Sequence, residues 1–151
     1  MAIVHDVIPP FQLFQPSSLD EALDLLDARG TEAWVMAGGM DSFDWLKDRT
    51  KRTSAVVELS QVGELHGIRE SDGGFEIGAM TTLTDVAEHA GIRDRFGMLA
   101  EAAGLVASPQ IRNQGTLAAM SRRTPAAGIT GAAGTATAQA ATSVTPTRRR
   151  R

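Results

Sequence analysis

The chain has 151 residues, 42% of them hydrophobic, and a formal net charge of −3, which suits one ordinary globular domain. It contains no Cys, which excludes disulfides, thiolate metal sites and Cys nucleophiles. No stretch approaches the roughly 20 apolar residues that cross a bilayer. Residues 1–6 also lack the basic flank and apolar core of a signal peptide, so we expect a cytoplasmic protein without a membrane partner.

The net charge hides two different compositions. Residues 1–117 hold all 18 acidic side chains and nine of the 15 basic ones, whereas residues 118–151 hold six Arg and no acid. Ala, Thr, Gly and Arg make up 26 of those last 34 residues. Because such a segment buries too little apolar area to offset the entropy of ordering, we predict a disordered, low-complexity tail. Its Arg148–Arg151 end lacks interleaved aromatic residues, so we expect no nucleic-acid partner.

Residues 1–61 predict a small parallel α/β lobe. The predicted elements are an extended piece ending at Pro16, a helix from Leu19 to Leu26 closed by Gly30, a strand over 33–37, a helix over 41–47 and a strand over 55–59. Ser17 or Ser18 supplies the cap of the first helix. In such a unit each strand end and the following helix start face one edge of the sheet, where ligands tend to bind.

Residues 62–117 predict the start of a second lobe, of α+β type and truncated. Two short extended runs, 68–70 and 75–78, flank an Asp-Gly-Gly turn and predict a hairpin. Helices are predicted over 84–88 and 98–103, the first of them capped by Thr82 or Thr84.

Two glycine-bearing loops are the candidates for binding chemistry. The Gly38-Gly39 turn leads into a helix, and such turns let backbone amides close on a phosphate with help from the helix dipole. Residues 112–116 form a second loop that offers amides, a guanidinium and a hydroxyl. A glycine pair that only makes a tight turn is the alternative, but two such loops from different lobes are what a diphosphate would need.

The other polar candidates have plainer interpretations, so we predict no catalytic residue and no metal site. The three His residues are isolated, which favours structural or surface roles. Asp41, Asp44 and Asp48 recur at helical spacing, but interleaved basic residues favour a solvated face. Trp34 and Trp45 are expected in the core or at a lobe contact. The sequence has no Rossmann, Walker or nucleophile-elbow motif.

Six segments carry a further signal through their order and spacing: residues 16–23, 37–41, 59–60, 64–68, 77–83 and 108–117. Together they resemble the N-terminal part of the FAD-binding subunit of molybdenum hydroxylases. That group includes the carbon monoxide dehydrogenase medium chain and the flavin subunit of xanthine dehydrogenase. Ala-Gly-Gly-Met-Asp at 37–41 and Ser-Pro-Gln-Ile-Arg-Asn-Gln-Gly-Thr at 108–116 are the most specific pieces. The resemblance covers about residues 10–117.

The resemblance implies an α+β, two-lobed FAD-binding fold of the PCMH or vanillyl-alcohol-oxidase type. FAD is the implied cofactor, with the 37–42 loop around its diphosphate and residues 78–82 near the isoalloxazine. In the family, a molybdopterin subunit oxidises substrate and an iron–sulfur subunit relays electrons to FAD, so these two subunits are the implied partners. The implied cofactor-binding residues are Ala37, Gly38, Gly39, Met40, Asp41, Ser42, Thr81, Thr82, Arg112, Asn113, Gly115 and Thr116.

The chain departs from the family after Leu117, and we expect nothing beyond that point to resemble it. The family continues Thr-Leu-Gly-Gly-Asn, whereas this chain continues with Ala118-Ala119-Met120. Codons GGC GGC AAT GTC TCG CAG G spell Gly-Gly-Asn-Val-Ser-Gln, and loss of the first G turns them into codons for residues 118–123. The same shift carried onward gives aromatic, Cys-bearing, family-like sequence. We interpret 118–151 as read out of frame; a natural low-complexity tail is the alternative.

The resulting hypothesis is a truncated FAD-binding fragment. Its parent role is electron transfer from iron–sulfur centres through FAD to an external acceptor. We expect this chain to bind FAD weakly or not at all, to aggregate through uncovered apolar surface, and to be inactive alone. Two rivals remain: a non-enzymatic α/β binding module with a basic tether, and an oxidase with covalent FAD. The second is disfavoured because no His or Cys lies near Gly38-Gly39.

Overall fold

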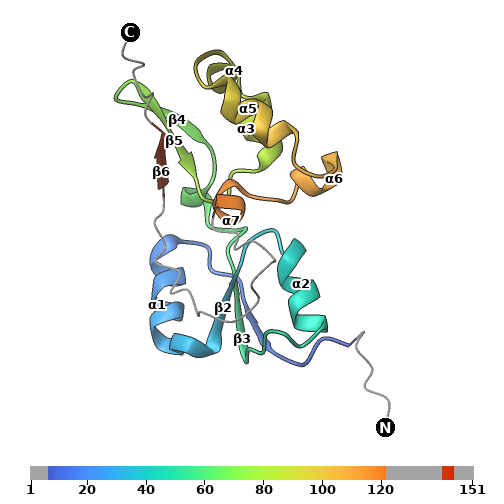
Figure 1. The fold of residues 1–151 in the computed structure, drawn as a ribbon. Helices are drawn as coiled ribbons and strands as arrows, with labels where there is room; N and C mark the ends of the chain where they lie inside the picture. The colour runs from blue at the N-terminus through green and yellow to red at the C-terminus, as the bar shows by residue number, and fades with distance from the viewer. Residues whose placement is uncertain (1–6, 122–140, 145–151) are drawn as a thin grey trace. The chain divides into compact units, whose positions relative to one another are not determined.

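The computed structural model describes residues 7–121 and 141–144 (Figure 1). The chain divides into two compact units, residues 1–64 and residues 65–151. Each unit has its own sheet of three strands. The mixture of helices and strands is the α+β class that the sequence predicts.

The first unit is a parallel sheet flanked by two helices (Figure 1). Its elements are β1 (Gln12–Phe14), α1 (Leu19–Arg29), η1 (Gly30–Glu32), β2 (Ala33–Met36), α2 (Met40–Lys47) and β3 (Ala55–Glu58), followed at the boundary by η2 (Gly63–Leu65). The strand order is β1-β3-β2, with both outer strands parallel to β3. The predicted strands and helices of this lobe are confirmed.

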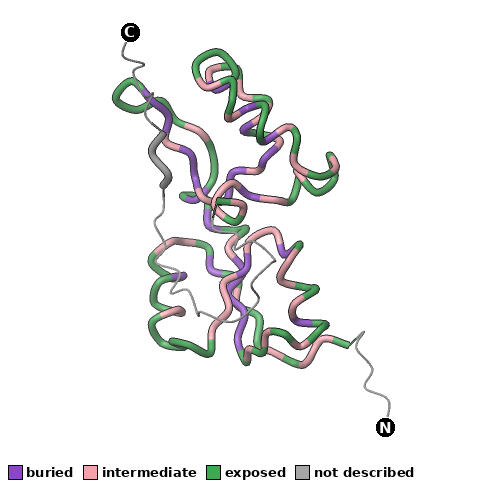
Figure 2. Tube along the Cα trace, in the orientation of Figure 1, coloured by how far each residue is buried: buried purple, intermediate pink, exposed green. Residues whose placement is uncertain are grey.

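Local sequence explains where these elements begin and end. The Ser18 hydroxyl accepts from the backbone N–H of Glu21 at 3.3 Å and caps α1, and Gly30 ends that helix with φ 53°. β3 is the central strand, and all four of its residues are buried, as the purple stretch in Figure 2 shows. A short Val-rich run is what a strand covered on both faces requires.

The second unit combines an antiparallel sheet with a cluster of short helices. Its elements are β4 (Ile68–Ser71), β5 (Gly74–Gly78), α3 (Leu83–Glu88), α4 (Ala90–Arg95), α5 (Gly97–Gly104), α6 (Pro109–Arg112), α7 (Leu117–Ser121) and β6 (Ala141–Val144). β4 and β5 form the predicted hairpin, and β6 pairs with the other edge of β5. Phe75, Ile77, Val86 and Ile92 form the centre of its core, each at most 2% exposed.

Two predictions for this unit need correction. The helices α4, α6 and α7 were not predicted. Residues Ala118–Ser121 continue α7 and residues Ala141–Val144 form β6, so the prediction of a disordered tail is wrong for these two segments. The rest of the predicted tail, 122–140 and 145–151, lies outside the described residues.

Candidate functional site

The Gly38-Gly39 turn follows β2 at the carboxyl edge of the parallel sheet and leads directly into α2. Gly39 has φ 77° and is the N-cap of that helix. A Cβ on Gly39 would lie 2.7 Å from Cε2 of Phe43, so the backbone conformation favours glycine there and a side chain would also displace the Phe43 ring. Gly39 is buried and Gly38 half-buried, whereas Met40 is 45% exposed, so the turn meets solvent at Met40.

The first turn of α2 offers amide donors to an anion. The first N–H groups of a helix have no intrahelical acceptor, and the helix dipole favours negative charge beside them. Phe43 N donates to Gly39 O at 3.0 Å, and Gly39 has no side chain to cap the amides before it. Asp41 places a carboxylate in the same turn and reduces this attraction. The Ser42 hydroxyl accepts from Trp34 Nε1 at 3.1 Å and fastens α2 to β2.

A buried carboxylate that the sequence analysis missed lies at the same edge of the sheet. Glu58, 8% exposed, ends β3 and pairs in register with Met36 of β2. It accepts hydrogen bonds from Gln15 Nε2 at 3.2 Å, Ser60 N at 2.8 Å and Ser60 Oγ at 2.7 Å. Gln15 follows β1, so Glu58 ties the carboxyl ends of neighbouring strands together. A charged residue that closes an apolar run was its only sequence signal.

The structure brings the second loop together with the predicted threonine segment. Thr82 and Thr116 form an antiparallel bridge, and Leu117 N donates to Thr81 O at 3.0 Å. Gly115 O accepts from Leu83 N at 2.9 Å. These bonds place one end of the loop beside the start of α3.

The polar side chains of this loop region hold it in place. Thr82 caps α3 in a capping box with Asp85, and the buried Thr81 hydroxyl donates to Gly67 O at 2.9 Å. Thr84 Oγ1 donates to Asn113 Oδ1 at 2.6 Å. Five of the predicted cofactor residues, Thr81, Thr82, Asn113, Gly115 and Thr116, therefore form one cluster in the second unit.

Arg112 and Thr116 differ in how their side chains are engaged. Arg112 Nη1 donates to Val106 O at 2.9 Å and Ala107 O at 3.1 Å, so part of its guanidinium fixes the segment before α6. Thr116 is 2% exposed, and its hydroxyl has no hydrogen-bond partner in the part of the chain that the structure describes. Burying a hydroxyl without a hydrogen-bond partner lowers the stability of the fold unless another group supplies that hydrogen bond.

His89 has a structural role, while Trp34 and Trp45 are half-buried and contact each other. His89 Nδ1 accepts from Ile92 N at 3.3 Å and caps α4, and the Trp34 and Trp45 rings meet edge to face with centroids 5.8 Å apart. Within residues 7–121 and 141–144, no three His, Asp or Glu side chains cluster as metal ligands. Over the same residues, no helix has the length and apolarity to cross a bilayer.

The α2 turn of the first unit fits a nucleotide diphosphate. Its first amides are not capped by a side chain of the N-cap residue Gly39, whose left-handed φ of 77° favours glycine. Backbone amides at a helix start are the donors that phosphate oxygens accept from.

Comparison with known proteins gives the same assignment. Residues 9–144 match the family described as the FAD binding domain in molybdopterin dehydrogenase. The match runs past Leu117, so the expectation that nothing beyond that residue resembles the family is wrong.

Relatives and solved structures agree with the family match. The chain is 38% identical over 112 residues to the carbon monoxide dehydrogenase medium chain of Hydrogenophaga pseudoflava, covering 74% of this chain and 39% of that protein. It is 36% identical to the nicotinate dehydrogenase FAD-subunit of Eubacterium barkeri, covering 71% of this chain and 36% of that one. A solved structure of the H. pseudoflava carbon monoxide dehydrogenase superposes with a TM-score of 0.72 at 37% identity, covering 74% and 39% of the two chains. The chain thus spans under two fifths of these relatives' length.

Proposed function

Because the chain belongs to the family of FAD-binding domains in molybdopterin dehydrogenases, we propose that it is part of a flavoprotein subunit that passes electrons through FAD to an external acceptor. FAD supplies the one- and two-electron chemistry when bound, and the protein supplies position and electrostatics. The relatives are named a medium chain and an FAD-subunit, which supports assembly with other subunits, and the partners we propose are a molybdopterin subunit and an iron–sulfur subunit.

The α2 turn is the observation that carries this proposal. In this proposal, the backbone amides of residues 38–42 hold the diphosphate of FAD, and Gly39 allows the backbone to make the turn. In the second unit, Thr116 offers a hydroxyl that has no hydrogen-bond partner within residues 7–121 and 141–144, and Thr81, Thr82, Asn113 and Gly115 shape the loop around it. Arg112 keeps guanidinium N–H groups beyond Nη1 for a phosphate oxygen.

We further propose that the reading frame changes after Leu117, so that this chain lacks the family's second glycine pair. The acid-free composition of 118–151 and the single-base arithmetic at codon 118 support this. The family match to residue 144 and the strand β6 support the opposite view of a native tail. The nucleotide sequence tests this proposal. If adding one base near codon 118 opens a long downstream reading frame, the frame change is supported. If adding a base opens no such frame, the frame change is overturned.

Flavin content tests both parts of the proposal. The 151-residue chain, purified with excess FAD and then desalted, should retain well below one FAD per chain by absorbance. The chain encoded after restoring the frame should retain close to one. One FAD per 151-residue chain would show that the missing glycine pair is not needed for binding, but would support the flavin assignment. No flavin on either chain would overturn the flavin assignment itself.

A further inference from the structure

Trp34 joins the parallel sheet of the first unit to the first turn of α2. It is half-buried in β2 and pairs in register with Val56 of the central strand. Its indole Nε1 donates to Ser42 Oγ at 3.1 Å, and its ring meets the Trp45 ring edge to face. Ser42 and Trp45 are three positions apart in α2, so they lie on one face of that helix. Trp34 thus contacts α2 at two points about one turn apart.

This contact matters because the connection between β2 and α2 has few side-chain anchors of its own. Residues 37–39 join the two elements, and two of these three residues are glycines. Gly39, the N-cap residue, provides no side-chain cap for α2. Glycine also permits many backbone conformations. The direction of the first amides of α2 therefore depends on how the helix is attached to the sheet.

Ser42 is in the right place to transmit this attachment to the amides. It is the third residue of α2 and directly precedes Phe43, whose N–H donates to Gly39 O at 3.0 Å. The indole N–H can only donate, so the Ser42 hydroxyl must accept, and the bond has one possible direction. A bond to this side chain fixes the last of the amides that come before the bond from Phe43 to Gly39.

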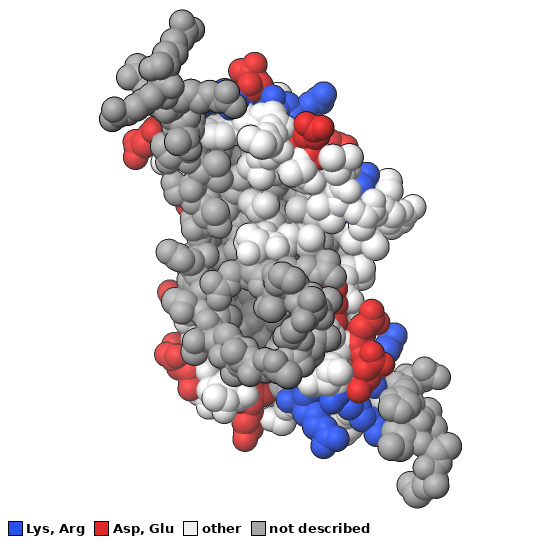
Figure 3. Space-filling view, in the orientation of Figure 1, with Lys and Arg blue, Asp and Glu red and all other residues white. Residues whose placement is uncertain are grey.

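Orientation is important at this turn because acidic side chains lie near it. Asp41 and Asp44 belong to α2, and the space-filling view shows Asp and Glu atoms on the side of the unit where α2 lies (Figure 3). Carboxylates repel a phosphate, whereas backbone amides bind it well only when their N–H groups point at its oxygens. A modest rotation of the first turn should therefore weaken anion binding.

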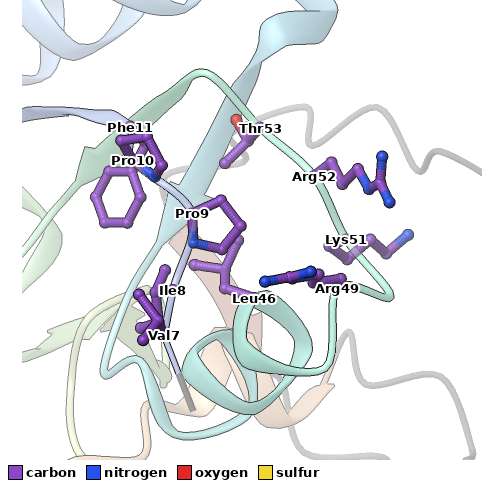
Figure 4. Close-up of a pocket in the computed structure, with 10 residues that line it drawn as sticks. All are labelled: Val7, Ile8, Pro9, Pro10, Phe11, Leu46, Arg49, Lys51, Arg52 and Thr53. Atoms are coloured by element: carbon purple, nitrogen blue, oxygen red, sulfur yellow. The ribbon is translucent and has the colours of Figure 1, made fainter. Parts of the chain in front are cut away.

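The other end of α2 is held by separate contacts. Leu46 is 3% exposed, and Lys51 N donates to Trp45 O at 3.2 Å. Lys51 Nζ lies 5.7 Å from the centre of the Trp34 ring, and this side chain points away from the apolar residues 7–11 (Figure 4). Loss of the bond between Trp34 and Ser42 should therefore loosen the first turn without releasing the helix.

We propose that Trp34 is a positioning residue for the diphosphate site and acts through the Ser42 hydroxyl. Its indole N–H holds the first turn of α2 so that the backbone amides of residues 38–42 point at the phosphate oxygens. A turn that is already arranged in this way loses little affinity to ordering when the anion binds. This role rests on the function proposed above, since it requires the turn to receive the diphosphate.

The test is a double-mutant cycle on the 151-residue chain, with ADP affinity measured from the NMR shifts of the amides of residues 38–42. Trp34→Phe keeps an aromatic ring but removes the donor, and Ser42→Ala removes the acceptor. If one bond positions the turn, each single variant and the double variant should weaken ADP binding by the same factor, about threefold to tenfold. Ser42→Thr keeps the hydroxyl and should bind ADP like the wild-type chain. Circular dichroism confirms that each variant is folded during the titration.

Ser54→Ala is the matched control. It removes a hydroxyl that donates to Glu32 Oε2 at 3.0 Å, at the edge of the sheet where β3 begins, and should leave ADP affinity unchanged. Unchanged affinity in Trp34→Phe, additive losses in the double variant, or an equal loss in Ser54→Ala would overturn the role of Trp34 alone. If ADP leaves the amides of residues 38–42 of the wild-type chain unshifted, the proposed diphosphate site is wrong and the role of Trp34 is overturned with it.

Discussion

At the scale of single residues, Gly39 carries two constraints that the other residues of its turn do not. Its φ of 77° lies in the left-handed region, and a Cβ would meet the Phe43 ring. The glycine pair was visible in the sequence, but its packing against Phe43, one turn into α2, was not. Sequence indicates that a glycine is favoured in this turn, whereas the structure shows that Gly39 is the one with the left-handed backbone and the close Phe43 contact.

Replacing Gly39 should therefore destabilise the first unit. We expect Gly39→Ala to lower the free energy of unfolding by about 1–2 kcal/mol, from the left-handed backbone and the displaced Phe43 ring together. Gly63→Ala is the control, because a Cβ there meets nothing within 4 Å and φ is not in the left-handed region. Urea denaturation measures both. Equal stability of the two variants would show that the turn tolerates a side chain.

The burial of Glu58 could not be predicted from its position in the sequence. Its partner Gln15 is 43 positions away in sequence, so burial of the carboxylate depends on pairing between β1 and β3. Glu58→Ala should cost about 2–3 kcal/mol, because it removes three hydrogen bonds to a buried carboxylate. Asp24→Ala, at an exposed position of α1, should change stability by less than about 0.5 kcal/mol. A thermal or urea melt in which both variants unfold alike would contradict the Glu58 network.

At the scale of elements, helices with local signals were predictable and the shortest ones were not. The caps at Ser18 and Thr82 lie next to the helices they start, so sequence alone located α1 and α3. α4, α6 and α7 have six, four and five residues, too few for an apolar period to show. Ser108 before Pro109 was an available signal for α6, since Ser caps helices and Pro favours their first turn.

The capping box of α3 gives a prediction at this scale. Thr82 Oγ1 accepts from Asp85 N at 3.1 Å, and Asp85 Oδ2 accepts from Thr82 N at 3.3 Å. Thr82→Ala should lower stability by about 1 kcal/mol, and Thr82→Ser, which keeps the hydroxyl, should recover most of it. Chemical denaturation of the second unit, followed by circular dichroism, checks this. Serine and alanine variants of equal stability would rule out the cap as the role of Thr82.

At the scale of the whole molecule, the order of predicted elements indicated two lobes and composition indicated a different tail, but neither indicated how strands pair. The order β1-β3-β2 places the last strand of the first unit in the centre of its sheet, which no local pattern specifies. Likewise, β6 pairs with β5 although more than 60 residues separate them along the chain. These pairings are non-local, so periodicity identifies each strand without indicating its neighbours.

The proposed cofactor site is also only partly predictable from sequence. The resemblance predicted two binding loops and the family's cofactor, and the structure groups five of the predicted residues in one cluster around Thr82 and Thr116. Neither the burial of the Thr116 hydroxyl nor the Glu58 network could be predicted, since each depends on segments that meet only in the folded chain.

The central claim is that the amides of the α2 turn receive the diphosphate of a dinucleotide. The most direct measurement is an amide NMR titration of the 151-residue chain with ADP, with adenosine as the control that lacks phosphate. The account predicts that ADP shifts the amides of residues 38–42 more than the other amides of the first unit, and that adenosine leaves them unchanged. Equal shifts with adenosine, or an unchanged 38–42 turn while ADP binds elsewhere, would contradict it.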